Sequence, residues 1–166
     1  MPKVERKGII MSTALKDTFW NRMDDVQAGL LSAAGERPIP MAPHADADEG
    51  AIWFIAAAGS AAERAAKGGD TASFLVADSK ANLYATLDGT LTEVNDSAKL
   101  DEIWSAVTAA WFEDGRDDDA VRLVKFTPKE GEVWATAKTA GFLYEIVKAN
   151  LGEDTPDAGE HGRLVF

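Results

Sequence analysis

The clearest pattern of hydrophobic and polar positions lies between residues 82 and 94, where apolar and polar side chains alternate. The apolar positions of this run are Leu83, Ala85, Leu87, Gly89 and Leu91. Alternation with a period of two predicts a long β-strand that buries one face and exposes the other. Gly89, in the middle of the run, predicts a bend or a bulge at that point.

Other segments also have the character of strands. Residues 29–34, 51–56 and 71–77 are short apolar segments, and turn residues bound each of them. Segments of this length and composition predict strands, which favours a sheet built from neighbours in the sequence.

Two regions predict strands of a less regular kind. Residues 121–127 and 132–136 predict a hairpin, because Pro128 to Gly131 between them has the composition of a turn. Residues 37–43 contain three prolines, which predicts an edge or bulged strand because proline cannot donate a backbone hydrogen bond. Residues 44–50 are expected to form a polar turn.

Four helices are predicted from apolar residues at helical spacing and from capping residues. The first begins at Ser12 or Thr13, and the third begins at Asp96 or Ser97. The second begins at Ser60, which forms a capping box with Glu63, and ends near Gly68. The apolar stripes are Leu15, Phe19, Met23 and Val26 in the first, Leu100, Ile103, Trp104, Val107 and Trp111 in the third, and Phe142, Leu143, Ile146 and Val147 in the fourth, which ends near Gly152.

The order of these elements predicts the fold class. Strands joined by short turns favour an antiparallel sheet, and seven strands in a chain of 166 residues favour a closed barrel. We therefore expect a mainly β, α+β domain built on a small antiparallel barrel. Residues 12–152 form this domain, residues 1–11 form an N-terminal extension, and residues 153–166 form a polar C-terminal tail.

Charge and composition exclude several classes of partner. The chain has 17 basic and 28 acidic residues, so its net charge is −11. This acidic balance argues against binding to nucleic acid or to anionic lipid, both of which need a basic face. No apolar run reaches the ~20 residues that span a bilayer, and the apolar run near the N-terminus, Ile9 to Met11, is too short for the core of a signal peptide. With no cysteine, the sequence predicts a soluble cytoplasmic protein.

No metal site or nucleophilic site is predicted. The two histidines, His44 and His161, are far apart in the sequence, and neither belongs to a cluster with the spacing of metal ligands. Residues 113–119 are acidic but lack the spacing of a calcium loop, so we interpret them as a solvated loop. The chain contains neither a G-x-S-x-G motif nor a glycine-rich nucleotide motif.

Two features leave alternatives open. The start of the helix at Ser60 offers free N–H groups that suit a phosphate, but Glu63 can close the same position as a structural cap. Trp111 and Phe112 lie beside the acidic loop. Their rings can plug the mouth of the barrel, pack across a subunit interface or stack on a flat ligand.

Eight short stretches of the sequence, taken in their order and spacing, point to a known family. They are VQAGLL at 26–31, RPIPM at 37–41, GAIWF at 50–54, Ser60, LDGT at 87–90, IW at 103–104, AWF at 110–112 and VW at 133–134. Together they resemble the general stress protein 26 branch of the pyridoxamine-phosphate-oxidase-like split barrels. The resemblance extends from about Leu15 to Phe142.

This resemblance implies a six-stranded antiparallel split barrel with flanking helices that pairs into a homodimer. It also implies FMN in a groove at the dimer interface, and a flavin-dependent oxidoreductase as the activity. The residues that it places around FMN are Arg37, Pro40, Met41, Phe54, Ile55, Ala56, Gly59, Ser60, Arg64 and Trp111. Among these, Arg37 and Arg64 would supply positive charge to the phosphate, and Met41 and Trp111 would contact the ring.

Three positions depart from the family pattern. Members commonly have Arg, Thr and Lys where this chain has Ile39, Ala56 and Ala62. Losing charge-assisted contacts at ~1.5–3 kcal/mol each would weaken phosphate binding by orders of magnitude unless other cations replaced them. Arg37, Arg64 and Lys67 are the candidate replacements. A deazaflavin cofactor, or a cofactor-free dimer that serves as an interaction module in stress response, remains an alternative.

Overall fold

The computed structural model describes residues 2–33, 35–136 and 159–166 of the chain. Its helices are α1 (Pro2–Met23), α2 (Ala61–Gly68), α3 (Ser97–Ile103) and α4 (Ala106–Ala109), with a 3-10 turn η1 (Gly115–Asp117). Its strands are β1 (Gly29–Ala33), β2 (Ile39–Met41), β3 (His44–Asp46), β4 (Ala51–Ala57), β5 (Thr71–Asp78), β6 (Leu83–Glu93), β7 (Val121–Ala135) and β8 (Glu160–Val165).

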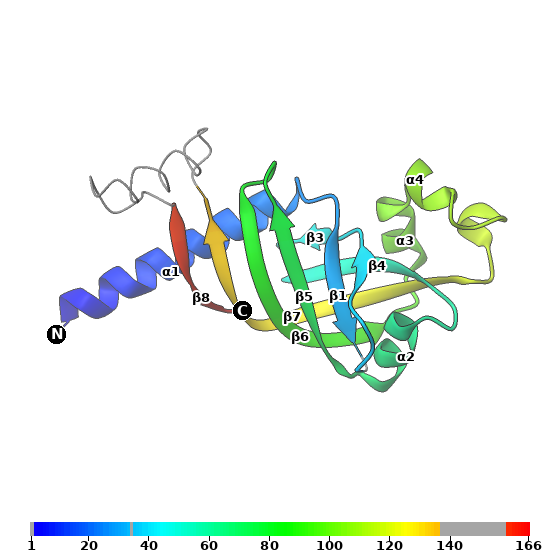
Figure 1. Ribbon diagram of the computed structural model, residues 1–166, viewed down its shortest axis with the longest axis horizontal. Coiled ribbons are helices and arrows are strands. Elements are labelled where there is room, and N and C mark those ends of the chain that lie inside the picture. Colours follow the sequence, from blue (N-terminus) through cyan, green and yellow to red (C-terminus); the bar gives the residue numbers. More distant parts are fainter. Residues whose placement is uncertain (1, 34, 137–158) are drawn as a thin grey trace.

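The strands form one antiparallel sheet in the order β2-β1-β5-β6-β7-β4-β3, and β8 adds to the second half of β7 (Figure 1). The two ends of this order, β2 and β3, are separated in the chain by Ala42 and Pro43 alone. The sheet therefore closes through this short connection, and β2 and β3 act together as one bent strand. The result confirms the six-stranded split barrel that the resemblance implied, with β8 as an additional strand outside the circuit.

The pairing of β6 with β7 confirms one prediction and corrects another. The register shifts between Asp88 and Gly89, so the predicted irregularity at Gly89 is present. The predicted hairpin at residues 128–131 is wrong, because β7 continues through it as one strand of 15 residues. Pro128 lies opposite Gly89 at the bulge, and a bulge is a place where a strand tolerates a residue without an N–H.

Aromatic and aliphatic side chains, which alternate with outward-facing residues along the strands, fill most of the barrel interior. Phe54 packs edge-on against Phe74 with ring centroids 5.0 Å apart, and the ring of Phe126 lies 6.5 Å from that of Phe74. The predicted apolar face of β6 is buried in this core, as the period-two pattern required. Large side chains from strands on opposite sides of the circuit therefore meet at the centre of the barrel.

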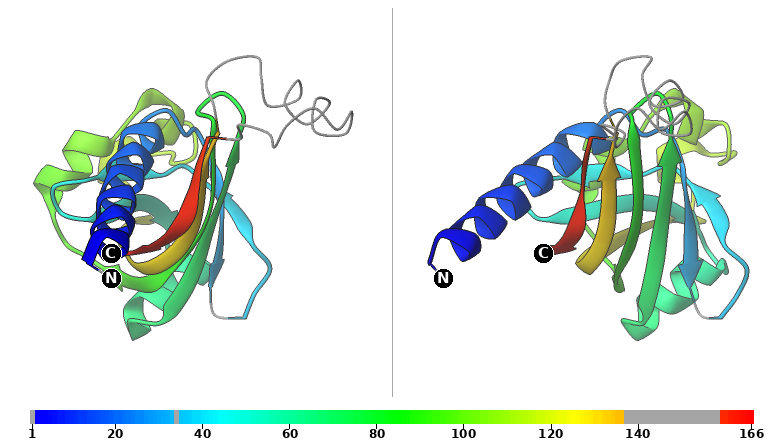
Figure 2. Two further views of the ribbon diagram at one scale, coloured as in Figure 1. Left: turned by 90° about the vertical axis from the view of Figure 1, so that its left-hand side faces the viewer. Right: turned by 60° about the vertical axis from the view of Figure 1, so that its left-hand side comes forward.

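The first helix packs alongside the barrel next to β8 (Figure 2). Its predicted stripe of Leu15, Phe19 and Met23 is buried, and the Phe19 ring lies 5.4 Å from the ring of Phe166. The helix begins at Pro2 rather than at Ser12, so residues 2–11 belong to it. Proline is tolerated at the first helical position because its missing N–H is not needed there.

Several local predictions are corrected in the remaining segments. The predicted third helix divides at Trp104, whose backbone is extended, and Ser105 caps α4. The predicted polar turn at 44–50 contains β3, and the predicted tail contains β8. The ion pair of Arg163 with Glu130 and the buried Leu164 hold β8 on β7. The helix predicted around residues 142–152 lies outside the described residues.

Candidate functional site

The start of α2 is closed by groups of the chain itself. Strand β4 ends at Ala57, and the chain turns through Gly59 into Ser60, the N-cap residue. The Ser60 Oγ atom accepts a hydrogen bond from the Glu63 N–H at 3.3 Å, and the Glu63 Oε2 atom accepts one from the Gly59 N–H at 3.3 Å. The predicted reciprocal cap is therefore present, with Gly59 rather than Ser60 as the backbone donor.

The carboxylate of Glu63 is held by two cations as well. Its Oε1 atom lies 2.9 Å from Lys67 Nζ, and its Oε2 atom lies 3.1 Å from Arg122 Nε. The hydrogen bond from Lys67 and the charges of Lys67 and Arg122 lower the pKa of Glu63, against the opposing effect of desolvation. Glu63 is only 5% exposed, so a buried anion already occupies the position where α2 begins.

The two arginines predicted to hold a phosphate differ in their surroundings. Arg64 donates from Nη1 to the Gly59 carbonyl at 2.5 Å and forms an ion pair with Glu36. Arg37 follows Glu36 and is exposed, and its side chain forms no ion pair within residues 2–33, 35–136 and 159–166. Arg37 is therefore the candidate cation that remains available to a ligand.

The candidate side chains on β2 and β4 do not all face the same way. Phe54 and Ala56 are buried in the barrel core, whereas Ile55 faces outward and packs in a small cluster with Trp53. Pro40 is exposed, and Met41 is half-buried against the core. The side chains of Phe54 and Ala56 are therefore unable to reach a ligand on the outside of the barrel, which leaves only their backbone groups.

An apolar strip runs across the outside of the barrel beside these residues. Leu30 pairs across strands with Pro40 on one side and with Leu75 on the other. Leu30 is 45% exposed and Leu75 is 36% exposed, although both are large apolar side chains. We call Pro40, Leu30 and Leu75 the outer strip. Exposed apolar surface of this kind, when contiguous, is typical of an interaction or ligand surface.

A shallow groove of about 630 Å³ borders the outer strip. Ser32, Ser73, Asp88 and Glu130 face it from four neighbouring strands. Ser73 donates from Oγ to Asp88 Oδ1 at 2.6 Å, so this part of the outer face is polar.

Trp111 lies away from the other candidates. It follows α4 and is 81% exposed, and Figure 1 shows α4 and α2 at opposite ends of one side of the molecule. A single copy of the chain therefore does not bring Trp111 to the start of α2. Any shared role with Arg37 or Ser60 requires a second copy.

A buried ion network that sequence reasoning missed lies on the other side of β4. Lys99 of α3 is 8% exposed, and its Nζ lies 2.9 Å from Asp46, 3.1 Å from Glu102 and 3.5 Å from Glu49. These carboxylates raise the pKa of Lys99, chiefly through the hydrogen bond to Asp46, and the same hydrogen bond lowers the pKa of Asp46.

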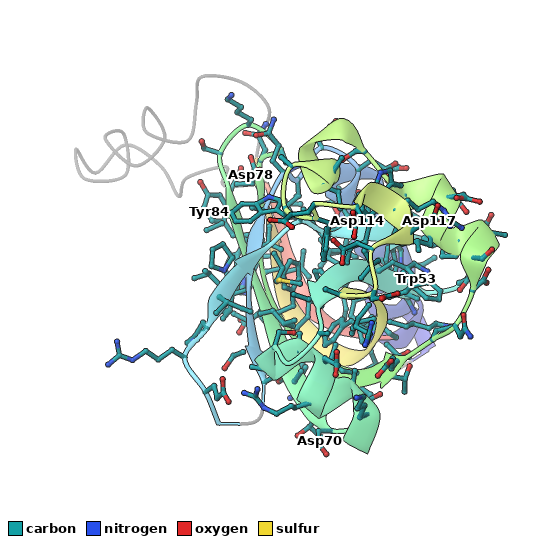
Figure 3. All side chains as sticks on the ribbon, turned by 90° about the vertical axis from the view of Figure 1, so that its right-hand side faces the viewer. Trp53, Asp70, Asp78, Tyr84, Asp114 and Asp117 are labelled. Carbon is teal, nitrogen blue, oxygen red and sulfur yellow. The ribbon has the colours of Figure 1, made fainter. Side chains whose placement is uncertain are left out.

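Trp53, labelled in Figure 3, lies close to two lysines of this region. Lys99 Nζ is 5.4 Å and Lys125 Nζ is 5.3 Å from its ring centroid, distances at which a cation is attracted by an aromatic ring. The Trp53 indole N–H is buried and has no hydrogen-bond partner in the described part of the chain.

Sequence reasoning also missed Arg122 at the start of α2. Arg122 reaches Glu63 because β4 pairs with β7 in a register that places Ala56 opposite Arg122. No local signal reveals which strand lies next to β4, so only the topology could have found this contact.

The residues at the start of α2 do not fit the phosphate of FMN. Ala56 and Ala62 are buried and offer no polar group, and Glu63 places a negative charge where the phosphate would lie. The prediction that Gly59, Ser60 and Arg64 bind a phosphate remains a prediction, and the structure supplies a competing group of the chain itself. Among the described helices, none combines the length and the apolar character that crossing a bilayer demands.

Comparison with known proteins places these features in context. Residues 15–157 match the model of the family described as pyridoxamine 5'-phosphate oxidase like. A structure described as general stress protein 26 from Jannaschia sp. CCS1 is 45% identical, with a TM-score of 0.84 over 93% of this chain and 99% of that one. A search of curated proteins found no match.

More distant structures share the fold. The general stress FMN/FAD binding protein from Xanthomonas citri is 23% identical, with a TM-score of 0.67 over 76% of this chain and 92% of that one. General stress protein 26 from Bacillus anthracis str. Sterne is 15% identical, with a TM-score of 0.60 over 72% of this chain and 92% of that one.

Proposed function

The chain belongs to the pyridoxamine 5'-phosphate oxidase-like family, in its general stress protein 26 branch, and on this premise we propose that it is a flavin-binding protein. In this proposal two copies join along the outer strip and form a crevice that binds FMN. The proposal also includes the cytoplasm as the compartment in which the protein works. The Xanthomonas citri relative, named as an FMN/FAD binding protein, supports flavin as the ligand class.

One observation carries the proposal: an exposed apolar strip lies beside an arginine, Arg37, that forms no ion pair with the residues the structure describes. Pro40 and Leu30 offer an apolar surface, and Arg37 is three residues before Pro40. A flat apolar ring with an anionic tail needs this combination of surfaces. Trp111 would reach the same crevice from the second copy.

A bound flavin would supply the redox chemistry of an oxidoreductase, and the chain would supply binding and orientation. Pro40 and Met41 would contact the ring, and Arg37 would pair with the phosphate. Phe54, Ile55 and Ala56 would contribute backbone groups of β4.

The test is a titration of FMN into the purified protein, followed by quenching of flavin fluorescence. We expect Arg37→Ala to weaken FMN binding about tenfold, the loss of one charge-assisted hydrogen bond, and to leave riboflavin binding unchanged. Arg163→Ala is the matched control, because Arg163 is exposed but lies on β8, outside the barrel circuit, and forms an ion pair with Glu130. Equal effects of the two variants would refute the role of Arg37.

The oligomeric state tests the crevice. Light scattering should report twice the chain mass of 17.8 kDa, and Leu75→Glu should shift the protein to a monomer, since it places a charge on the outer strip. A wild-type monomer would remove the shared crevice and with it the proposed site.

A second candidate is a cofactor-free dimer that acts as an interaction module. The buried Ala56 and Ala62 and the charge of Glu63 favour it, because all three oppose a phosphate at α2. A dimeric protein that is colourless as purified and does not quench FMN fluorescence would establish this candidate over the first.

A further inference from the structure

The donors around the Glu63 carboxylate form a complete anion position. The Gly59 N–H and Arg122 Nε approach one carboxylate oxygen, and Lys67 Nζ approaches the other, at 3.3, 3.1 and 2.9 Å. A backbone N–H, a guanidinium and an ammonium that meet at one point are also the groups with which proteins bind phosphate. In this chain the anion that they bind is a side chain located one turn further along α2.

The positive and negative charges at this position balance, so no net positive charge remains for an incoming anion. Lys67 and Arg122 supply two positive charges, while Glu63 and Glu93, whose Oε1 lies 3.8 Å from Arg122 Nε, supply two negative charges. A ligand phosphate would have to displace Glu63 and leave that carboxylate buried without a partner, which is strongly unfavourable.

The alanines beside this position give an anion no further partner. Ala62 and Ala56, next to Glu63 and opposite Arg122, are both buried in the core. Neither residue carries a polar atom in its side chain that could bind a phosphate.

We propose that Glu63 is the built-in occupant of the anion position at the start of α2, and that the chain thereby excludes a ligand phosphate from this position. The consequence for ligand choice rests on the flavin binding proposed above. The phosphate of FMN gains nothing from α2, so the preference for FMN over riboflavin is limited to the contribution of Arg37.

The direct test compares the melting temperature in inorganic phosphate with that in chloride at equal ionic strength. Wild-type protein should show no difference between the two salts, because its anion position is filled. Glu63→Ala should melt lower in chloride and gain about 4 °C in phosphate at tenfold excess over the dissociation constant. Glu63→Ser, which removes the charge and vacates the position but keeps a hydroxyl in the first turn of the helix, serves if the alanine variant does not fold.

Glu93→Gln is the matched control. It removes one negative charge near Arg122 but leaves Glu63 in place, so it should behave like the wild type in phosphate. A phosphate-specific rise of similar size in the wild type would overturn the proposal. A folded Glu63 variant that gains nothing from phosphate would overturn it as well.

A second measurement uses the wild-type protein and does not require a Glu63 variant. FMN and riboflavin should bind within about tenfold of each other, and Arg37→Ala should make them equal. A preference above a hundredfold that survives Arg37→Ala would place the phosphate at α2 and overturn the proposal. If neither flavin binds, the flavin function fails, and the phosphate melting experiment alone decides the role of Glu63.

Discussion

Replacing Lys99 by methionine tests whether the buried ion network stabilises the barrel. Methionine keeps the apolar stem that packs near Trp53 and removes the charge that Asp46, Glu49 and Glu102 share. Among the three carboxylates, Asp46 has the least exposed side chain, at 23%, so it is the charge that suffers most from the loss of its partner.

The expected magnitude follows from this partial burial. Removing one partner of a fully buried ion pair destabilises a protein by about 3–5 kcal/mol. Asp46 retains some solvent and a hydrogen bond from the Glu49 N–H, so we expect about 2–3 kcal/mol for Lys99→Met. In a domain of this size that corresponds to a fall in melting temperature of about 5–10 °C.

The assay is urea or thermal unfolding of the wild type, Lys99→Met and Lys125→Met. Lys125→Met is the matched control: Lys125 also lies over the Trp53 ring, but it is more exposed, and its ion pair with Glu49, at 3.4 Å, is longer than the 2.9 Å between Lys99 and Asp46. We expect it to cost below about 1 kcal/mol. Equal losses in the two variants, or a loss below 1 kcal/mol for Lys99→Met, would refute a stabilising role for the network.

Two further predictions concern pH and the bulge. The pKa of Asp46 is lowered in the folded state, so its ionised carboxylate stabilises the fold at pH values above its ordinary pKa of 3.8. This stabilisation is lost as the pH falls through the pKa of the folded state. In acid unfolding, the difference in stability between the wild type and Lys99→Met should therefore shrink below about pH 4. Gly89→Ala should lower the free energy of unfolding, measured in urea, by about 2 kcal/mol, because an added Cβ would lie 2.9 Å from both Phe126 Cζ and Pro128 Cα. Thr86→Ala, at an exposed position of the same strand, is the control and should be nearly neutral.

Local signals in the sequence predicted much of the fold. The alternation around Leu87 and the caps at Ser60 and Asp96 depend on residues within a few positions of one another, and the structure confirms them. The continuity of β7 could not be predicted in this way. Pro128 breaks a strand when considered alone, and it is tolerated here because the partner strand bulges opposite it.

The candidate site could likewise be predicted only where its contacts join residues close together in the sequence. The cap formed by Ser60 and Glu63 was one of two readings that the sequence left open, and it is present. The ion pair of Arg64 with Glu36, and that of Arg122 with Glu63, join residues 28 and 59 positions apart. Such pairs follow from strand order and register, which a single sequence does not reveal.

The long strand β7 has a consequence for how fast the protein folds. It pairs with β6 along most of its length, with β4 over its first half and with β8 over its second half. Its pairs with β4 join residues separated by more than sixty positions, such as Trp53 and Lys125. Contacts so distant in sequence must form before the circuit can close, so we expect refolding on the millisecond-to-second timescale of other β-barrels rather than the microseconds of helical bundles.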